Sequence, residues 1–423
     1  MKNHQIICVL GLGYVGLPLA LALSRHYPVC GVDVNSDRIK ELSSGVDITG
    51  EVTSAELSRS NLNFQETIPV TNQTVVYIVT VPTPVNNANT PDLTAIMSAT
   101  KSVGLRLKAR DVVVYESTVF PGCTEEECVP ILESVSGLKF VKDFGVAYSP
   151  ERINPGDKVN KLEVITKVLG ASDAITLEKC KAIYESIITA GVYVTESIKI
   201  AEAAKIIENT QRDVNIAFMN ELSIVFDRMD IDFTKVLAAA ATKWNFLDFK
   251  PGLVGGHCIG VDPYYLLEST AKMGYLPDII SSSRKVNESM PRLVADNIVK
   301  KSIQKGIDLP KARFLFLGIT FKENCPDIRN SKSVELLYNL LDYGFEIDVV
   351  DPWVSSQDRA LRENKSVLDA IPSDTMYSGI IISVPHKIFQ LEKYIDLDTQ
   401  LSPGGVFVDL KNAFPDVKSD YRL

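Results

Sequence analysis

The first half of the chain alternates short apolar runs with longer stretches in which apolar positions recur at helical spacing. Such runs are typical of strands in a parallel sheet, and the stretches between them are typical of the helices that cover it. Helices are predicted, for example, at 92–107 and 174–188. The predicted strands are Ile6–Leu10, Val29–Asp33, Thr74–Val81, Asp111–Glu116, Phe144–Ser149, Val164–Leu169 and Gly191–Thr195. Residues 1–197 are therefore expected to form one doubly wound domain.

The pattern changes at Ile198, because the chain from there to about Met229 holds no glycine or proline and keeps apolar residues at helical spacing. This predicts one long helix joining two domains. After Pro310 the alternation resumes. It predicts strands at Phe314–Leu317, Glu346–Asp351, Ile380–Val384 and Val406–Asp409, with a helix at Ser333–Asp342; a separate helix is predicted before Pro310, at Ser281–Lys305. The expected fold class is α/β, with two doubly wound Rossmann-like domains joined by a long central helix, divided as 1–197, 198–308 and 309–423.

The amino-acid composition indicates the cellular compartment of the protein and argues against some classes of binding partner. A net charge of −9 without a Lys/Arg run argues against a nucleic-acid surface. Seven scattered cysteines, an odd number, suggest reduced thiols instead of a disulfide framework. The apolar run at 6–23 resembles a secretory signal, but Gly11, Gly13, Gly16 and Pro18 interrupt it. No other segment offers the ~20 apolar residues of a membrane span. We therefore expect a cytoplasmic protein without membrane or nucleic-acid partners.

A glycine motif follows the first predicted strand and opens a helix. It reads Gly11-Leu12-Gly13-Tyr14-Val15-Gly16, and the next strand ends at Asp33. This spacing allows a tight turn, close approach of backbone to a pyrophosphate, and packing of helix on strand. An acid at Asp33 favours NAD over NADP, because it accepts hydrogen bonds from the ribose and repels a 2′-phosphate. Arg38 is expected to stack on adenine or to face solvent, with a phosphate contact the less favoured alternative.

Two further predicted strands end in polar residues that belong at the same edge of the sheet. Pro82 and Thr83 follow one strand, and Thr118 follows the next. Ligands of open α/β sheets bind at the carboxyl ends of the strands. Contacts to a cofactor and ordinary turn chemistry are about equally expected for each threonine taken alone.

The most unusual segment is the glycine-rich stretch from Pro251 to Tyr265, which contains Gly255, His257 and Cys258. Its glycines allow a ligand to approach the backbone and leave a thiol unobstructed, whereas an isolated cysteine is usually a small buried hydrophobic residue. Adjacent side chains in extended backbone point apart, so a Cys–His dyad is the less favoured interpretation. No pair of the four histidines has metal-ligand spacing, so no metal is predicted.

The long helix carries Lys205 and Asn209, which share a face because they are four residues apart. On spacing alone, an ordinary solvated lysine with a polar neighbour is the simpler interpretation. Ala201 and Ala204, however, would let a ligand or a second element approach that face closely.

These residues together resemble the UDP-glucose/GDP-mannose dehydrogenase family essentially from end to end. The matching stretches are Gly11–Gly16, Val81–Pro84, Ser117–Val119, Ser149–Glu151, Glu202–Asn209, Gly255–Asp262 and Phe321–Lys322 with Arg329. The resemblance implies an NAD-dependent enzyme in which 1–197 binds NAD, 198–308 carries the cysteine loop and a homodimer interface, and 309–423 binds a UDP-sugar. The stretches 150–156 and 255–265 are similar to the branch that oxidises UDP-N-acetylhexosamines, UDP-GlcNAc or UDP-GalNAc, to uronic acids for surface polysaccharides.

The resemblance implies a four-electron oxidation of the C6 hydroxyl through a thiohemiacetal and a thioester on Cys258. Lys205 and Asn209 would stabilise the developing alkoxide. Asp262 and Glu151 remain alternative handlers of the proton of the attacking water, with Thr118 orienting that water. Substrate contacts are implied for Glu151, Arg152, Asn154, Lys205, Asn209, Gly255, His257 and Lys322, and a cofactor contact for Arg329.

The sequence departs from the glucose-oxidising branch at three places. Pro155 replaces an expected glutamate, Gly260-Val261 replaces Pro-Lys, and an arginine contributed across subunits has no match, with Lys243 the nearest cation. These losses favour a pocket built for an acetamido group, with UDP-glucose and UDP-ManNAc kept as alternative substrates. A two-electron dehydrogenase of β-hydroxyacid type leaves the cysteine loop and the second domain without a role. A silent nucleotide-binding regulator leaves Cys258, Lys205 and Asp262 unexplained.

Overall fold

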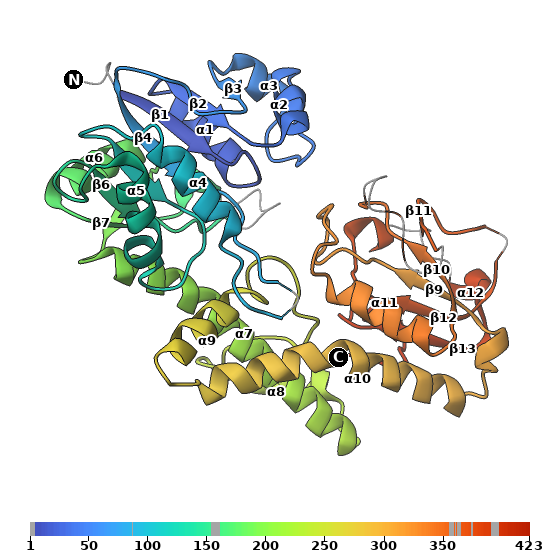
Figure 1. Ribbon diagram of the computed structural model, residues 1–423. Coiled ribbons are helices and arrows are strands. Elements are labelled where there is room, and N and C mark those ends of the chain that lie inside the picture. The colour runs from blue at the N-terminus through green and yellow to red at the C-terminus, as the bar shows by residue number, and fades with distance from the viewer. Residues whose placement is uncertain are drawn as a thin grey trace. The chain divides into compact units, whose positions relative to one another are not determined.

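A computed structural model describes residues 5–86, 88–153, 161–354, 359, 361, 365–373, 375–390 and 397–423. The chain divides into two compact units (Figure 1). The first comprises Met1–Asn209 with Tyr264–Tyr275, and the second comprises Thr210–Pro263 with Leu276–Leu423. The 31-residue helix α7 (Ile198–Arg228) passes from the first unit into the second, which confirms the predicted long helix. The predicted α/β architecture of two Rossmann-like domains is likewise confirmed.

The first unit is built on an eight-stranded sheet in the order β3-β2-β1-β4-β5-β6-β7-β8. Its strands are β1 (Gln5–Leu10), β2 (Val29–Val32), β3 (Asn63–Gln65), β4 (Thr74–Val79), β5 (Val112–Tyr115), β6 (Gly145–Tyr148), β7 (Lys167–Ala171) and β8 (Val192–Val194). Its helices include α1 (Gly16–Ser24), α2 (Ser36–Ser43), α3 (Ser54–Arg59), α4 (Thr94–Gly104), η1 (Thr124–Cys128), α5 (Val129–Ser136), η2 (Leu162–Val164) and α6 (Ala174–Glu185).

One edge of this sheet departs from the predicted parallel arrangement. The pairs from β3 through β6 are parallel, but β7 pairs with β6 in the antiparallel sense and β8 follows β7. A parallel connection needs a crossover, usually a helix. In the described residues between β6 and β7, the short 3₁₀ turn η2 is the regular element. The chain therefore reverses, and the first residue of β7 lies at the edge where β6 ends.

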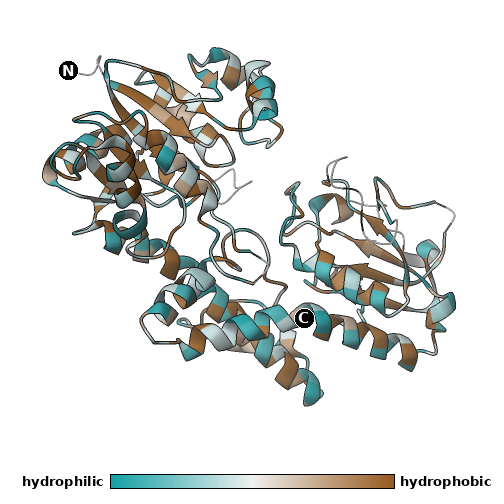
Figure 2. Cartoon of the chain, in the orientation of Figure 1, coloured by the Kyte–Doolittle hydropathy of each residue, from teal (hydrophilic) through white to brown (hydrophobic). Residues whose placement is uncertain are grey.

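The pattern of buried side chains explains why the strands and helices form. All residues of β2, β5 and β6 are buried, as expected for strands covered on both faces. Figure 2 shows the strands of both sheets in brown, whereas the helices mix teal and brown. The prediction missed β3 and β11 (Val367–Leu368) because both are short edge strands without an apolar run.

The second unit carries a parallel sheet in the order β11-β10-β9-β12-β13. Its remaining strands are β9 (Arg313–Leu317), β10 (Glu346–Val350), β12 (Tyr377–Ile382) and β13 (Leu401–Asp409). Its helices are α8 (Phe233–Ala240), the start of α9 (Asp262–Lys272), α10 (Asp278–Gln304), η3 (Leu309–Lys311), α11 (Lys332–Asp342), η5 (Lys387–Gln390) and α12 (Leu397–Gln400). Successive residues of β9 enter two separate cores, with Phe314 and Phe316 on one face and Leu315 and Leu317 on the other. Helices α10 and α11 pack side by side (Figure 1).

A glycine turn held by an aspartate follows strand β1 in the first sheet and strand β9 in the second. In the first unit, Gly11 adopts a φ of 91° and Leu12 donates its backbone N–H to Asp33 Oδ2 at 2.8 Å. In the second unit, Gly318 adopts a φ of 81° and Ile319 donates to Asp351 Oδ2 at 2.8 Å. In both cases an acid at the end of the next strand holds the amides of the glycine turn. The turn is thereby fixed before any ligand arrives.

Candidate active site

The glycine turn of the first unit has the shape that a dinucleotide requires. A Cβ at Gly16 would lie 1.8 Å from the carbonyl oxygen of Gly11, so helix α1 can pack against the turn only with glycine there. A Cβ at Gly13, in contrast, would meet nothing within 4 Å. Gly13 thus faces open space at the N-terminus of α1, where backbone amides and the helix dipole favour a pyrophosphate. Tyr14 and Val15 complete the predicted motif and lead directly into α1.

Asp33 lies at the end of β2, where a ribose would bind. Its two oxygens accept hydrogen bonds from the backbone N–H groups of Leu12 and Asn35, at 2.8 and 2.9 Å. Each carboxylate oxygen has a second lone pair, so the group can still accept from ribose hydroxyls. The turn and this acid together fit NAD, which would accept hydride from the substrate.

Arg38 does not face solvent, and that expectation is wrong. The side chain is buried, and its Nε donates to the carbonyl of Leu12 at 2.9 Å. Its two terminal nitrogens pair with Glu41 at 2.6 Å and Asp47 at 2.8 Å. With all three nitrogens engaged, the guanidinium braces the glycine turn and is poorly placed to bind a 2′-phosphate. The sequence could not reveal this because Asp47 lies in a loop with no evident motif.

The carboxyl ends of β4 and β5 are held together by hydrogen bonds. Ser117 Oγ donates to the carbonyl of Val81 at 2.7 Å, and Tyr265 of α9 donates its hydroxyl to the carbonyl of Thr83 at 2.8 Å. Pro82 is exposed, whereas Thr83 and Thr118 are half-buried. These predicted residues therefore occupy the strand-end positions that the sequence suggested, with partial access to solvent.

The first part of α7 is anchored to the segment that follows Thr118. Glu202 is fully buried and accepts hydrogen bonds from the backbone N–H groups of Gly122 and Thr124, at 2.5 and 2.9 Å. Lys205, one turn later, is also buried, so it is not the ordinary solvated lysine that spacing alone favoured. Asn209 is half-buried. Glu202 thus fixes the helix that presents both predicted alkoxide donors.

Glu151 and Arg152 follow β6 and are both engaged by protein groups. Glu151 Oε1 accepts from the N–H groups of Arg152 and Ile153, each at 2.6 Å, and its Oε2 lies 3.3 Å from Lys167 Nζ. The Arg152 guanidinium pairs with Glu208 of α7 at 2.8 Å. Asn154, predicted as a substrate contact, lies outside the described residues.

The cysteine loop of the second unit is clamped against the segment before α11. Asn330 accepts the N–H of Gly256 at 3.0 Å and donates its side-chain amide to the Gly256 carbonyl at 2.8 Å. A Cβ at Gly255 would lie 2.4 Å from the carbonyl oxygen of Asn330. All seven cysteines are described, and Cys258 is half-buried while the other six are buried. The predicted nucleophile is therefore the thiol with access to a ligand.

Asp262 begins α9 one turn after Cys258. Its N–H donates to the Cys258 carbonyl at 2.8 Å, and its side chain is almost fully buried. Beneath the loop, Arg284 of α10 is buried, and a Cβ at Gly260 would lie 3.3 Å from its Nη1. Arg284 pairs with the fully buried Asp213 of α7 at 3.3 Å. The prediction missed this support, because Arg284 and Asp213 show no motif that links them to the cysteine.

His257 turns towards an acid of the second domain. Its Nε2 lies 3.6 Å from Asp327 Oδ2, and its ring packs edge-on against Phe321. Burial, together with the positive charge of Arg329, lowers the pKa of His257 despite Asp327. Arg329 itself pairs with Asp327 at 2.7 Å, and Lys322 Nζ lies 5.5 Å from the centre of the Phe321 ring. The second unit thus gathers Gly255, His257 and Cys258 with Lys322 and Arg329.

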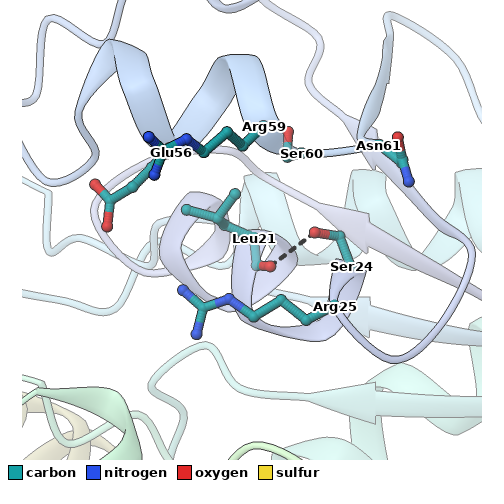
Figure 3. Close-up of a pocket in the computed structure, with 7 residues that line it drawn as sticks. All are labelled: Leu21, Ser24, Arg25, Glu56, Arg59, Ser60 and Asn61. Carbon is teal, nitrogen blue, oxygen red and sulfur yellow. Dashed lines mark hydrogen bonds between the residues drawn. The ribbon is translucent and has the colours of Figure 1, made fainter.

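A hollow of ≈ 390 Å³ lies elsewhere on the first unit, between the end of α1 and helix α3 (Figure 3). Its lining residues are Leu21, Ser24, Arg25, Glu56, Arg59, Ser60 and Asn61. Since α1 runs back from the glycine turn, its last residues lie at the amino edge of the strands. The hollow is therefore separate from the nucleotide-binding edge.

No helix in the described parts of the chain is long and apolar enough to cross a membrane.

Comparison with known proteins decides the family. Models of the UDP-glucose/GDP-mannose dehydrogenase family match residues 5–188 with the NAD binding domain, 199–289 with the central domain and 315–416 with the UDP binding domain. The chain belongs to this family. It is an NAD-dependent UDP-sugar dehydrogenase, and the glycine turn with Asp33 lies within the part that matches the NAD binding domain.

Full-length relatives agree with this assignment. The chain is 49% identical to the UDP-N-acetyl-D-glucosamine 6-dehydrogenase of Pseudomonas aeruginosa, with 100% of both chains covered. It is 48% identical to the enzyme of the same name from Salmonella typhi, covering 99% of this chain and 98% of that one. The solved UDP-D-ManNAc dehydrogenase of Pyrococcus horikoshii superposes with a TM-score of 0.86 at 28% identity, covering 98% and 97%. The alternative interpretations of the chain, as a two-electron β-hydroxyacid dehydrogenase or a silent nucleotide-binding regulator, are not favoured.

Proposed function

We propose that the chain oxidises the C6 hydroxyl of a UDP-N-acetylhexosamine to a carboxylate, with UDP-GlcNAc as the preferred substrate. The observation that carries the proposal is the identity of 48–49% over the full chain to two UDP-N-acetyl-D-glucosamine 6-dehydrogenases. The similarity to the UDP-D-ManNAc dehydrogenase is lower, at 28%. Gly260-Val261 in place of Pro-Lys agrees with a pocket rebuilt around an acetamido group. The product would serve surface polysaccharide synthesis in the cytoplasm.

The reaction that fits these residues is a four-electron oxidation. Bound NAD would supply the hydride acceptor for both oxidations, that of the alcohol and that of the thiohemiacetal which Cys258 forms with the aldehyde; each oxidation uses one NAD. The second oxidation leaves a thioester on Cys258, and water hydrolyses it to the carboxylate and the free thiol. Lys205 and Asn209 donate hydrogen bonds to the developing alkoxide, where loss of one donor typically costs about 3–4 kcal/mol. Either Glu151 or Asp262 takes the proton of the attacking water, which Thr118 orients.

The sugar and nucleotide contacts divide between the two units in this proposal. Residues 1–197 hold NAD, 198–308 carry the cysteine loop and the subunit interface, and 309–423 bind the UDP-sugar, with Lys322 and His257 as contacts. Gly255, whose missing side chain admits the Asn330 carbonyl, contacts the substrate through its backbone, while Arg152 and Asn154 contribute from the segment after β6. Arg329 acts near the cofactor or at the domain interface.

The substrate assignment is tested by kcat/KM for UDP-GlcNAc, UDP-GalNAc, UDP-ManNAc and UDP-glucose at saturating NAD. We expect UDP-GlcNAc to exceed UDP-glucose by at least about 10-fold, which corresponds to about 1.4 kcal/mol of discrimination. Preference for UDP-ManNAc or UDP-glucose would contradict the assignment. A preference for UDP-GalNAc would retain the substrate class and change the epimer.

We also propose that the enzyme is a homodimer. The helices of the second unit and the segments between them leave large apolar side chains exposed, which is typical of protein–protein interfaces. These are Phe218, Val225, Met229, Ile231, Trp244, Leu247, Leu276 and Ile279, with Trp244 92% exposed. Light scattering should give about twice the chain mass of 46.6 kDa for the wild type. Trp244→Glu should shift the mass towards the monomer, whereas a monomeric wild type would refute the proposal.

A further inference from the structure

Four polar side chains form a buried cluster at the carboxyl edge of the first sheet. Lys167 Nζ lies 2.7 Å from Glu116 Oε2 and 3.3 Å from Glu151 Oε2. Tyr184 of α6 donates its hydroxyl to Glu116 Oε1. Lys167 is 3% exposed and Glu116 is 2% exposed, so the ammonium and the carboxylate are removed from solvent. Neither residue has a part in the reaction described above.

The antiparallel strand β7 brings the lysine to this position. Ala147 pairs with Ala171 and Tyr148 with Gly170, and continuing the same register places Lys167 opposite Glu151. A parallel β7 would have put its first residue at the amino edge of the sheet, far from the ends of β5 and β6. The strand reversal therefore delivers a cation to the edge where the substrate and cofactor residues gather.

The contacts hold the Glu151 side chain in one orientation. One of its oxygens accepts from two backbone N–H groups, of Arg152 and Ile153, and the other accepts from Lys167. Burial would lower the pKa of Lys167, but Glu116 and Glu151 outweigh it and the pKa is raised, so the lysine stays charged. A buried charge is costly unless an opposite charge and hydrogen bonds compensate for its removal from water.

The cluster holds one carboxylate more than it needs to neutralise the lysine. Glu116 alone, fixed by Tyr184, supplies a counter-charge for Lys167. Glu151 therefore gains a fixed cation beside it without being required for the lysine's own neutrality. Burial raises the pKa of Glu116, and the negative charge of Glu151 adds to this. Arg152, which follows Glu151 in the chain, pairs with Glu208 of α7.

We propose that Lys167 is a positioning residue of the reaction, which holds the Glu151 carboxylate in place while Glu116 and Tyr184 fix Lys167 from the other side. The proposal rests on the role of Glu151 in handling the proton of the water that hydrolyses the thioester. Loss of Lys167 then slows thioester hydrolysis and leaves the two preceding hydride transfers intact.

The test compares Lys167→Met, Glu151→Gln and the double variant of both in the full-length enzyme with saturating NAD and UDP-GlcNAc. Rapid mixing separates the burst of NADH, which reports the hydride transfers, from the steady-state kcat, which reports hydrolysis. Lys167→Met should keep the burst and lower kcat at least 10-fold. Because Lys167 acts through Glu151, adding Lys167→Met to Glu151→Gln should lower kcat less than twofold further.

Two more variants separate positioning from folding. The double variant Glu116→Gln/Lys167→Met removes both members of an oppositely charged pair, so it leaves neither charge unpaired. It should restore the thermal midpoint of unfolding that Lys167→Met lowers, but it should not restore kcat. Lys179→Met, which removes a lysine of α6 that bonds the Arg110 carbonyl, is the control for charge loss and should keep wild-type kcat.

Recovery of kcat in the Glu116/Lys167 double variant would overturn the proposal, because Lys167 would then serve only to balance Glu116. Additive losses in the Lys167/Glu151 pair would overturn it as well. If Glu151→Gln keeps wild-type kcat, the role of Glu151 and the proposal fail together. The oxidation itself is judged separately, from the NADH formed by the wild-type enzyme.

Discussion

Asn330 and Gly256 bond to each other twice, through the Gly256 N–H to the Asn330 carbonyl at 3.0 Å and through the Asn330 side-chain amide to the Gly256 carbonyl at 2.8 Å. The two residues are 74 positions apart in the chain. This pairing ties the loop of Cys258 to the segment that carries Lys322 and Arg329. The position of the proposed nucleophile is therefore set by the second domain and not by the loop alone.

Gly256→Ala should disrupt this clamp. Gly256 has a φ of 83°, and a Cβ there would lie 2.7 Å from the Phe321 ring. Left-handed backbone costs a non-glycine residue about 1–2 kcal/mol, so we expect kcat/KM for the UDP-sugar to fall roughly 10-fold or more. Gly252→Ala is the matched control, since a Cβ there meets nothing within 4 Å. Equal activity of the two variants in a steady-state assay would show that the clamp is dispensable.

Asp33→Ser should weaken NAD binding without creating use of NADP. The substitution removes a charged acceptor for the ribose, an interaction worth about 1.5–3 kcal/mol, so kcat/KM for NAD should fall at least about 10-fold. NADP should gain little, because Glu41 and Asp47 hold the guanidinium of Arg38. Initial rates with both cofactors measure this, and the KM for the UDP-sugar serves as the internal control. Efficient NADP turnover would mean that Arg38 can leave its partners.

Stability of the second unit should depend on the ionisation of Asp213. Burial raises the pKa of Asp213 to about 6, although Arg284 and Asn287 act in the opposite direction. The unfolded value is about 3.9, so the folded state binds the proton more tightly. The contribution of Asp213 to stability is thus complete below pH ~4 and is lost as the pH rises through about 6.

Asp213→Asn does not titrate. Its free energy of unfolding relative to wild type should therefore rise by about 2 kcal/mol between pH 4 and 7. Urea unfolding followed by tryptophan fluorescence measures this directly, because both tryptophans, Trp244 and Trp353, lie in the second unit. Asp227→Asn removes an exposed carboxylate from the same helix and is the control for charge loss. If the difference in free energy of unfolding between Asp213→Asn and wild type stays constant with pH, the raised pKa of Asp213 is refuted.

Most of the fold follows from hydrophobic periodicity, but strand direction does not. The buried runs at β1, β4 and β9 and the uninterrupted helix α7 are visible in the sequence because each buries a regular set of positions. The reversal of β7 depends on the connection that precedes it and leaves no trace in the residues of the strand. Its consequence, the placing of Lys167 beside Glu151, was for the same reason not predicted.

Features of the site that neighbouring residues form could be predicted from the sequence, whereas contacts between residues far apart in the chain were missed. The glycine turn with Asp33 and the Cys258 loop are recognisable because glycine spacing and strand ends constrain them directly. Arg38 was misjudged since its partner Asp47 comes from an irregular loop. The Asn330 clamp and the Arg284–Asp213 pair join segments far apart in the chain, and a single sequence does not display such contacts.

Cys258 is proposed to carry the sugar as a thioester, and counting the NADH formed from a limiting amount of UDP-GlcNAc tests this directly. The wild type should form two NADH per sugar. Cys258→Ala should form at most one and release an aldehyde, while Cys180→Ala, which removes a buried thiol of α6, should keep two. One NADH per sugar from the wild type, or full turnover by Cys258→Ala, would contradict the account.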